Sequence, residues 1–507
     1  MANYISNQTT TQRVVVFFLL LSYINNIIRL SDDRIEVEID MVTGQTESIQ
    51  TKIKRGPIVT VFLIGAFLAV LNQTLLITAT PQIMDELGLT ENTAQWVTTI
   101  FMLISGIMIP ITAFLMETFS TRRLFAVSML IFILGTFISA LSLSFSMLML
   151  GRIVQSIGAG VIMPLMMTVF IIIFPIERRG FAMGMAGLVI SFAPALGPAL
   201  SGWFIEYLPW RSLFYAILPI AIIDLVLAFY FMKDVIPRSF PKVDILSIIL
   251  STLGFGGLLY GFSLAGNYGW ANKIVIISIV IGMITLTWFI LRQMKLTQPM
   301  LEFRVFKYRT FTLATIIGTI TFTVLIAAET LLPIYMQLMA GFTALESGIM
   351  ILPGALLMGF ASPIIGQIFD RVGARWLLII GMTIMATTTL LFTNLTAETS
   401  LTYLIIAFAV RMLGIAMVMM PSTTAGLNIL PVHLMSHGTA MINTMRQVGA
   451  SIGTAMFITI MTVTALKPSS ASDTMALIHG VNISFYVMTA VTFIGLLLTF
   501  FINEQKS

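Results

Sequence analysis

Long runs of apolar residues, separated by short polar loops, dominate this sequence of 507 residues. A helix needs roughly 20 apolar residues to cross the hydrocarbon core of a bilayer, so a series of such runs predicts an all-α membrane protein. The pattern predicts fourteen transmembrane helices. They span residues 58–80, 94–116, 124–143, 147–170, 183–205, 212–232, 245–265, 274–291, 311–338, 346–368, 376–393, 402–428, 439–465 and 480–502.

Composition agrees with this pattern and excludes other classes of protein. Hydrophobic residues account for 58% of the chain and charged residues for 10%, whereas about a quarter of the residues in a soluble domain are charged. The sequence has no cysteine and no phosphate-binding loop of the type Gly-x-x-x-x-Gly-Lys-[Ser/Thr], which argues against a thiol nucleophile and against ATP-driven transport. It also lacks paired catalytic residues at one membrane face. We therefore expect neither an enzyme nor a cofactor.

Basic residues fall on alternate loops between the predicted helices, and this pattern predicts the orientation. The opposite loops hold only Arg211, Lys273 and Lys467. Because loops rich in lysine and arginine stay in the cytoplasm, we expect a multi-pass protein of the plasma membrane with both termini cytoplasmic. The net charge of +5 then gives no reason to expect a nucleic acid partner. The basic loops carry Lys52, Lys54, Arg55, Arg122, Arg123, Arg178, Arg179, Lys233, Arg238, Lys242, Arg292, Lys295, Arg304, Lys307, Arg309, Arg371, Arg375 and Lys506.

The first 55 residues fit this pattern poorly, and we expect them to form a cytoplasmic extension. The apolar run over residues 14–28 is short for a crossing. No small-residue cleavage site follows it, which argues against a signal peptide. Two interpretations remain: the run forms an interfacial helix, or translation naturally begins at Met41. We favour the second.

Several residues recur about 250 positions later in the chain, which indicates an internal duplication. Duplicated helix bundles are common in transporters, where they face one another across a central cavity. The sequence therefore predicts two six-helix bundles, over residues 56–235 and 311–503, with an inserted helix pair and linker over residues 236–310. The recurring pairs are Gly88 and Gly341, Thr90 and Thr343, Glu117 and Asp370, and Arg152 and Arg411.

A loop in the second half contains the pattern Gly-x-x-x-Asp-Arg-x-Gly-x-Arg, formed by Gly366, Asp370, Arg371, Gly373 and Arg375. With the apolar runs and the repeat, this motif resembles the major facilitator superfamily, and specifically its fourteen-span drug:proton antiporter branch, over residues 55–503. The resemblance implies the major facilitator fold, with two six-helix bundles and two inserted helices.

The first half has a weaker form of the same loop. Its residues at the equivalent positions are Ala113, Glu117, Thr118, Ser120 and Arg122, followed by Arg123. An acidic group beside helix ends and basic neighbours can lock two bundles together and release them when protonation or substrate shifts the balance. The alternative is membrane anchoring by the arginines alone, which does not explain the glycines. We favour gating.

Residues 193–203, in the fifth predicted span, resemble the motif that marks exporters within this superfamily. Its key residues here are Pro194, Gly197, Pro198 and Gly202. Proline kinks a helix and glycine permits close helix contact, so the segment predicts a tight, bendable seam between helices. Glycine and proline are also common in spanning helices generally, but their spacing here favours the antiporter interpretation.

Two arginines within predicted spans are candidates for function. Arg152 and Gln155 lie in a pattern similar to the family's Arg-x-x-Gln-Gly-x-Gly motif. An arginine inside a span is costly unless it faces a cavity or a partner, so we favour proton coupling for Arg152 over a structural role in binding backbone carbonyls. Arg446 could neutralise a carboxylate across the cavity or bind carbonyls, and the sequence does not choose between these.

Proton coupling needs a carboxylate that titrates when the cavity changes sides. Glu329 and Asp224 are the acidic residues deepest in predicted helices, and Glu329 ranks first. Their alternatives are a carboxylate satisfied near the outer interface for Glu329 and a structural pair with a neighbouring bundle for Asp224. Many members of the family carry an aspartate in the first span, in the pattern Leu-Asp-x-Thr, but Asn72 stands at that position here and cannot titrate.

The predicted substrate cavity contains Asn72, Gln73, Gln155 and Arg446, whose polar groups can hydrogen-bond substrate or a neighbouring helix. No metal site is expected. His433 and His437 have the spacing of a helical metal pair, but they fall in a predicted cytoplasmic loop without a third ligand.

The resemblance implies a proton-coupled antiporter that exports hydrophobic drugs or other small amphipathic compounds, such as lincosamide or macrolide antibiotics, dyes or biocides. It implies a monomer whose partners are small hydrophobic substrates, protons and membrane lipid, with the proton gradient as the energy source. A proton-coupled uptake transporter of the same fold for a small-molecule nutrient is the alternative. A channel or a membrane-bound sensor is disfavoured, because duplicated bundles imply a moving cavity.

Overall fold

The computed structural model describes residues 55–465 and 473–502. The predicted N-terminal extension and the start at Met41 lie outside the described residues. Within these ranges, fourteen helices are long and apolar enough to cross a membrane, which confirms the predicted number. They are α3 (Arg55–Thr74), α6 (Trp96–Thr118), α7 (Thr121–Ala140), α8 (Phe145–Ile173), α9 (Arg179–Tyr207), α10 (Ser212–Phe231), α11 (Ile245–Tyr268), α12 (Lys273–Lys295), α13 (Arg309–Leu338), α14 (Ala344–Val372), α15 (Ala374–Leu391), α16 (Leu401–Asn428), α17 (Met435–Thr464) and α18 (Asp473–Thr499).

Short helices fill some of the connections between the spans, and the described regular structure is entirely helical, as the predicted fold class requires. These are the α-helices α4 (Thr80–Leu87) and α5 (Glu91–Ala94) and the 3₁₀ helices η1 (Ile176–Arg178), η2 (Phe303–Lys307), η3 (Phe392–Asn394) and η4 (Val432–Leu434).

Two helix boundaries differ from the prediction in ways that matter for the site. The sequence predicts a first span up to residue 80, but α3 ends at Thr74 and the chain turns before α4, whose first turn contains Pro81. Proline favours the first turn of a new helix because its missing N–H needs no partner there. The sequence also predicts a loop up to residue 438, but α17 already begins at Met435. His437 is therefore part of a helix.

The predicted repeat also appears in backbone conformation at the helix ends. Gly88 ends α4 with φ = 63°, and Gly341, after α13, has φ = 73°. Glycine adopts this left-handed conformation without the steric penalty that a side chain brings. The halves differ at the gating loop: Gly373 joins α14 to α15 with φ = 82°, whereas the side chain of Ser120 caps α7. A serine cap thus replaces the left-handed glycine in the weaker motif.

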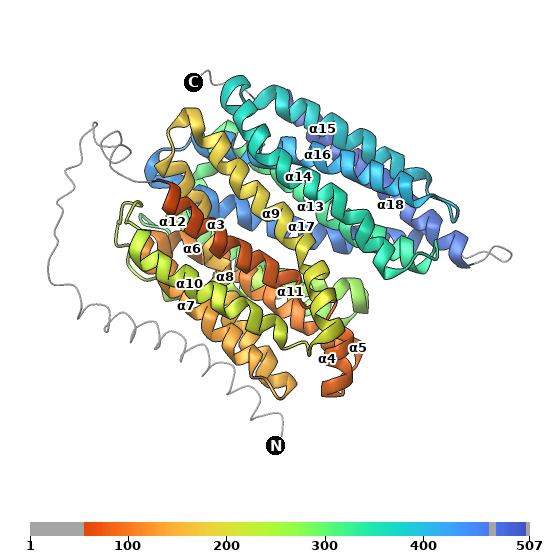
Figure 1. Cartoon of the computed structure of the whole chain (residues 1–507). Helices are drawn as coiled ribbons and strands as arrows, with labels where there is room; N and C mark the ends of the chain where they lie inside the picture. Colours follow the sequence, from red (N-terminus) through yellow and green to blue (C-terminus); the bar gives the residue numbers. More distant parts are fainter. Residues whose placement is uncertain (1–54, 466–472, 503–507) are drawn as a thin grey trace. The chain divides into compact units, whose positions relative to one another are not determined.

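The helices pack in two groups, and a few helices connect them (Figure 1). In the first half, α8 packs against α3, α6 and α7, and α10 packs against α3 and α7. In the second half, α16 packs against α13, α14 and α15, and α18 packs against α13, α15 and α17. Between the groups, α9 lies along α14, and α6 and the inserted helix α11 lie against α17. These are the most extensive contacts between the halves, and α9 also contacts α16 while α8 contacts α17.

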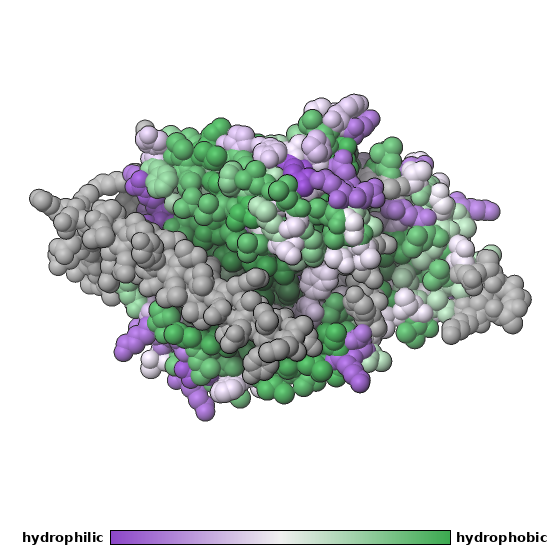
Figure 2. All heavy atoms as spheres, turned by 90° about the horizontal axis from the view of Figure 1, so that it is seen from below, coloured by the Kyte–Doolittle hydropathy of each residue, from purple (hydrophilic) through white to green (hydrophobic). Residues whose placement is uncertain are grey.

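Burial separates the central helices from the peripheral ones. Of the fourteen spanning helices, α8 is the most buried and α12 the least. The exposed side chains of α12 are large and apolar, including Ile277, Ile284 and Trp288. Figure 2 shows hydrophobic residues over much of the visible face of the molecule, with hydrophilic residues gathered in separate patches. Such an apolar outer surface suits contact with lipid chains rather than water.

Candidate functional site

Arg152 of α8 lies at the centre of a buried polar cluster in the first half. Its side chain is fully buried. Its guanidinium donates to the carbonyl of Val97 at 3.0 Å, to the side-chain oxygen of Asn72, and to Oε1 of Gln155 at 2.8 Å. The ring of Phe101 lies 4.3 Å away, in cation–π contact. The structure thus brings together three residues that the sequence singles out separately.

The partners of Arg152 are neutral, so its charge has no carboxylate to balance it within this cluster. Gln155 extends the hydrogen-bond network to Thr136, because its Nε2 donates to Oγ1 of that residue at 2.7 Å. The Nδ2 of Asn72 finds no hydrogen-bond partner among the described residues. Gln73 is half-buried, and none of the hydrogen bonds of this network involves it. Arg152 binds carbonyls, as the structural alternative expects, and neutral side chains as well, and its role in proton coupling stays a prediction.

Arg411 of α16 is the counterpart of Arg152 in the second half. It is fully buried and donates from Nη2 to the carbonyl of Val324 on α13 at 2.7 Å. Its Nε and Nη1 find no partner among the described residues. Glu329, also on α13, lies close enough for the two charges to interact, and its side chain is partly exposed. The sequence pairs Arg411 with Arg152 by position but does not select it as a site residue.

Asp224 of α10 is a buried carboxylate without a partner. Its side chain is fully buried, and neither oxygen accepts a hydrogen bond from a described residue. It faces α3 at Gly65, where an added Cβ would lie 3.0 Å from Oδ2. The predicted alternative, a structural pair with a neighbouring bundle, is not what these contacts show. An ionised carboxylate in such surroundings costs several kcal/mol unless a cation or water reaches it.

Arg446 of α17 binds main-chain and hydroxyl oxygens rather than a carboxylate. Its Nη2 donates to the carbonyl of Met419 at 2.9 Å and to Oγ1 of Thr423 at 2.6 Å, both on α16. Gly318 of α13 lies against the guanidinium. The open choice from the sequence is therefore decided in favour of carbonyl binding. Arg446 lies between α13, α16 and α17, apart from the cluster around Arg152, so the four predicted cavity residues do not form one group.

The first of two contacts that close the bundles involves Asp370. We call the ends of the helices that adjoin Arg122, Lys233, Arg304 and Arg371 the basic end. There, the carboxylate of Asp370 on α14 accepts hydrogen bonds from the backbone N–H groups of Gly180 at 2.7 Å and Phe181 at 3.0 Å. These N–H groups belong to the first turn of α9, where the helix dipole favours a negative charge.

Glycines allow this contact to be close. An added Cβ on Gly366 would collide with the carbonyl oxygen of Gly180. Beside the contact between Gly366 and Gly180, Nη1 of Arg179 donates to Oδ1 of Asn428 on α16 at 3.0 Å. Arg371 is exposed and Arg375 is half-buried, and the hydrogen bonds that Asp370 accepts come from backbone groups instead. Gly366 of the motif therefore has a packing function that anchoring alone does not explain.

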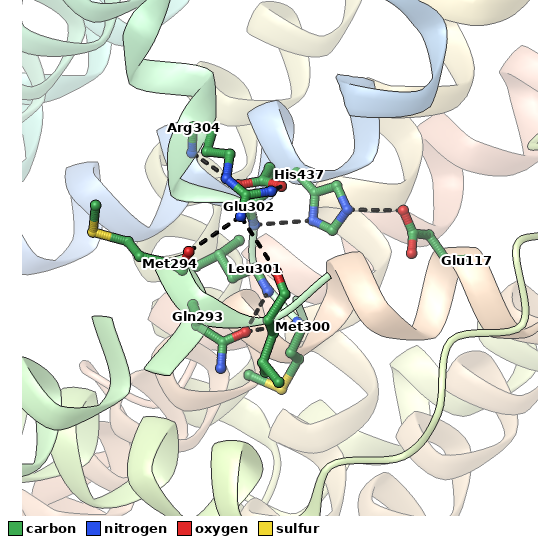
Figure 3. A network of polar contacts seen from close by, with 9 residues as sticks. Glu117, Gln293, Met294, Met300, Leu301, Glu302, Arg304 and His437 are labelled. Atoms are coloured by element: carbon green, nitrogen blue, oxygen red, sulfur yellow. Dashed lines mark hydrogen bonds and ion pairs between the residues drawn. The ribbon is translucent and has the colours of Figure 1, made fainter. Parts of the chain in front are cut away.

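The second contact joins Glu117, near the end of α6, to His437, in the first turn of α17. Oε1 of Glu117 lies 2.8 Å from Nε2 of His437 (Figure 3). Its Oε2 accepts a hydrogen bond from Oγ of Ser239 at 3.0 Å. The prediction that His437 lies in a loop is wrong, because α17 begins before it and buries the imidazole. The sequence contained a signal for this pair, since Glu117 repeats Asp370, but not the identity of its partner.

In the loop between α6 and α7, Arg122 binds groups of the first half. Arg122 donates from Nη2 to the carbonyl of Phe229 on α10 at 2.6 Å, and its backbone N–H donates to Asp234 at 3.2 Å. Arg123 is half-buried and also has interaction partners. In the described part of the chain, no group of three or more metal-ligating side chains occurs. Glu117, at the start of this loop, contacts the other half through His437.

In the segment of α9 that resembles the exporter motif, one glycine packs closely against another helix and the other glycine does not. Pro194 and Pro198 both lie inside the helix. An added Cβ on Gly197 would collide with Thr74 of α3, as a tight seam requires. The same expectation is wrong for Gly202, where an added Cβ would meet nothing within 4 Å. Gly202 lies in the last turns of α9, towards the end opposite the basic end.

Close contact between α9 and α14 is therefore confined to part of their length. Gly180 and Gly366 meet at the basic end, and Gly359 meets Phe192 further along. At the other ends of the two helices, neither Gly202 nor Gly348 has an atom near its Cβ position. Side chains join the two halves at the basic end, where Asp370 and Glu117 each bind the first turn of a helix from the other half.

Comparison with known proteins identifies this arrangement. A family model described as Major Facilitator Superfamily matches residues 62–454. The uncharacterized MFS-type transporter YcnB of Bacillus subtilis (strain 168) is 54% identical over 457 residues, which cover 90% of this chain and 97% of that protein. The lincomycin resistance protein LmrB of the same strain is 41% identical over 476 residues, which cover 92% of this chain and 99% of that protein.

Solved structures show the same fold at much lower sequence identity. The crystal structure of the human organic anion transporter MFSD10 (TETRAN) aligns with a TM-score of 0.63 and 14% identity, covering 88% of this chain and 100% of that chain. At this identity the likeness concerns the fold alone.

Proposed function

The chain belongs to the major facilitator superfamily and is a membrane transporter rather than an enzyme, and we propose that it is a proton-coupled antiporter that exports hydrophobic drugs or similar amphipathic compounds. The basic end then faces the cytoplasm by the positive-inside rule. In this proposal both termini are cytoplasmic, and the protein is in the plasma membrane. The cargo is a compound of the lincosamide type, in line with the name of the relative that confers lincomycin resistance.

The observation that supports the proposal is that Glu329 of α13 lies close enough to the buried guanidinium of Arg411 on α16 for their charges to interact. Ionised Glu329 attracts this guanidinium, whose Nε and Nη1 have no hydrogen-bond partner among the described residues. Protonated Glu329 no longer attracts it, and the arginine can turn to other acceptors. Because α13 and α16 belong to the same half, a proton on Glu329 changes the packing inside that half.

Asp224 gives the first half a titratable group as well. It lies between α10 and α3, next to the helix that carries Asn72. Since Asn72 is neutral, Asp224 and Glu329 are the carboxylates that can carry protons within the spans. Contacts between the halves at the basic end, through Asp370 and Glu117, are those expected of an outward-facing state in this orientation. Protons would then enter from outside and leave to the cytoplasm when the gate at Asp370 opens.

Reconstituted vesicles test the proposal directly. Purified protein in proteoliposomes should move lincomycin against its concentration gradient when a pH gradient is imposed, with protons flowing the opposite way. An uncoupler should stop the accumulation, and ATP should have no effect. Transport that is unchanged after the gradient is dissipated would overturn the antiport mechanism. Movement of cargo in the same direction as protons would indicate uptake instead.

A further inference from the structure

The contact between Glu117 and His437 also includes the linker from the inserted helices. The backbone N–H of Glu302 donates to Nδ1 of His437 at 3.3 Å (Figure 3). A nitrogen that accepts an N–H bond carries no proton, so the geometry defines a neutral imidazole with its proton on Nε2. That proton points to Oε1 of Glu117. His437 is thus a donor to one partner and an acceptor from the other.

Hydrogen bonds also anchor the backbone segment that binds this histidine to the inserted helix pair. Oε1 of Gln293, near the end of α12, accepts from the backbone N–H of Met300 at 2.7 Å, and its Nε2 donates to Oγ of Ser247 on α11 at 2.6 Å. Met300 is two residues before Glu302. The segment that binds His437 is therefore anchored to α11 and α12, and Figure 3 shows it between Gln293 and the imidazole.

Other charged residues around the start of α17 have partners of their own or face outwards. These are Glu302 with Arg304, Asp244 with Arg292, Arg122 with the carbonyl of Phe229, and the exposed Lys307 and Arg309. Glu117 is thus the carboxylate that contacts the imidazole. Any further proton on His437 must go to Nδ1, where it would point at the N–H of Glu302.

We propose that His437 is a positioning residue of the transport cycle, which responds to the proton concentration at the basic end. A proton on Nδ1 turns the contact with Glu117 into an ion pair, which holds α6 and α17 together more firmly. The same proton removes the acceptor of the Glu302 N–H and frees the linker of the inserted helices. Acidification at the basic end therefore favours the closed state of the two halves. The proposal rests on the proposed function only in placing this end in the cytoplasm.

The distance between the halves at the basic end tests this inference without any transport measurement. The chain contains no cysteine, so spin labels attach only at introduced sites. We suggest Lys233→Cys, after α10, and His433→Cys, in η4, because both side chains are exposed and neither belongs to the contact. In nanodiscs, the open, long-distance population should fall about threefold or more between about pH 8 and about pH 6.

Two variants separate the histidine from other titrating groups. His437→Gln keeps a donor for Glu117 but cannot take up a proton, so its long-distance population should no longer follow pH. Glu117→Gln removes the partner of the ion pair and should have the same effect, which keeps the test valid if one variant folds poorly. His479→Gln is the matched control, since His479 is exposed on α18, and it should behave as the unaltered protein does.

The outcomes are distinct. If His437→Gln and Glu117→Gln follow pH as the unaltered protein does, His437 is not the responsive group and the inference is wrong. An increase of the open population on acidification would also overturn it, because it would mean that loss of the Glu302 contact outweighs the ion pair. Failure of the uncoupler to stop transport would instead refute the antiport mechanism while leaving this distance measurement unaffected.

Discussion

The carboxylate of Asp370 accepts a 2.7 Å hydrogen bond from the backbone N–H of Gly180, so that an acidic side chain of the second half caps the first turn of a helix of the first half. Glu117 makes the reciprocal contact, from the first half to the start of α17. The internal repeat thus places two related contacts between the halves at the basic end. In one the carboxylate binds backbone N–H groups, and in the other it binds a histidine.

Removing the charge of Asp370 should weaken the contact between Asp370 and the first turn of α9. In Asp370→Asn, one oxygen becomes an N–H donor that faces the N–H groups of α9. The loss of a charge-assisted hydrogen bond costs about 2 kcal/mol, which corresponds to a shift of roughly 30-fold towards the open state. Spin labels at Arg178→Cys and Trp376→Cys, both exposed, should report more of the long distance. Asp85→Asn, at an exposed site on α4, should leave the distribution unchanged.

The close approach of α9 and α14 predicts opposite effects for two alanine substitutions in the same helix. Gly366→Ala should disrupt the seam, because the new Cβ collides with Gly180. Gly348→Ala meets nothing within 4 Å and should be neutral or stabilising by up to about 1 kcal/mol, since alanine is the better helix former. Thermal unfolding in detergent and the same label distances compare the two. Equal behaviour of both variants would refute the packing explanation.

Glu329→Gln should abolish proton-driven efflux while leaving substrate binding measurable. The neutral amide keeps the size of the side chain but neither titrates nor attracts Arg411 with a full charge. Asp224→Asn should reduce efflux partially, by a few-fold, because one of two titratable groups remains. Efflux in proteoliposomes and binding of labelled lincomycin measure the two effects. Glu398→Gln, in an exposed loop, is the matched control, and normal driven efflux in Glu329→Gln would exclude this residue from the coupling.

Asn72→Asp should be tolerated and should add a carboxylate to the first half. The aspartate replaces an Nδ2 that lacks a described partner, and it places a negative charge against Arg152. Removing a buried unsatisfied donor gains about 1–3 kcal/mol, so the thermal unfolding midpoint should rise. Gln73→Glu, at the neighbouring half-buried position, should give no such rise. In the double variant with Glu329→Gln, part of the dependence of efflux on the pH gradient should return.

At the end opposite the basic end, Glu86 connects α4 to the start of α10. Its Oε1 accepts from Arg211 at 2.6 Å and its Oε2 from Nε1 of Trp210 at 2.8 Å. The hydrogen bond from Arg211 holds the pKa of Glu86 below its usual range, and that from Trp210 adds to this. Because the pKa is lower in the folded state, the contact stabilises the protein above the unfolded-state pKa and is lost as the pH falls through the folded-state value.

Two substitutions separate the charge of Glu86 from its role as an acceptor. Glu86→Ala leaves the buried Nε1 of Trp210 without its acceptor and should cost about 1–2 kcal/mol. Glu86→Gln keeps an acceptor and should cost less, since the glutamate is partly exposed and its ion pair is screened by solvent. Glu86→Gln should differ from the unaltered protein at neutral pH and converge with it in acid, whereas Glu86→Ala should stay less stable there, because a protonated Glu86 still offers Trp210 an acceptor. Asp85→Ala, at the adjacent exposed site, controls for the loss of one negative charge.

Much of the architecture was predictable because each part of it has a local cause. Apolar runs of sufficient length must form helices in lipid, so the number of spans follows from hydropathy alone. The repeat was visible in pairs such as Gly88 and Gly341, whose left-handed conformation requires glycine. Arg152 was a candidate from its charge within a span, and the structure adds the partners that satisfy it.

Other features depend on residues far apart in the chain, and the sequence pattern contains no measure of their distance. The position of His437 against Glu117 follows from the packing of α17 on α6, together with a helix that begins earlier than its polar first turn suggests. The partners of Arg446 lie on α16, and the lack of a neighbour at Gly202 depends on how α9 packs against other helices. None of these relations has a local signal.

By itself, the sequence determined that the chain is a bundle of fourteen membrane helices built from a repeat, since hydrophobic length and recurring glycines act within one segment at a time. The tertiary structure decided which buried charges are satisfied and which are not. Arg152 has its full set of neutral acceptors, whereas Asp224 has none among the described residues. The physical reason is that a buried charge depends on the atoms around it, and in this fold those atoms come from other helices.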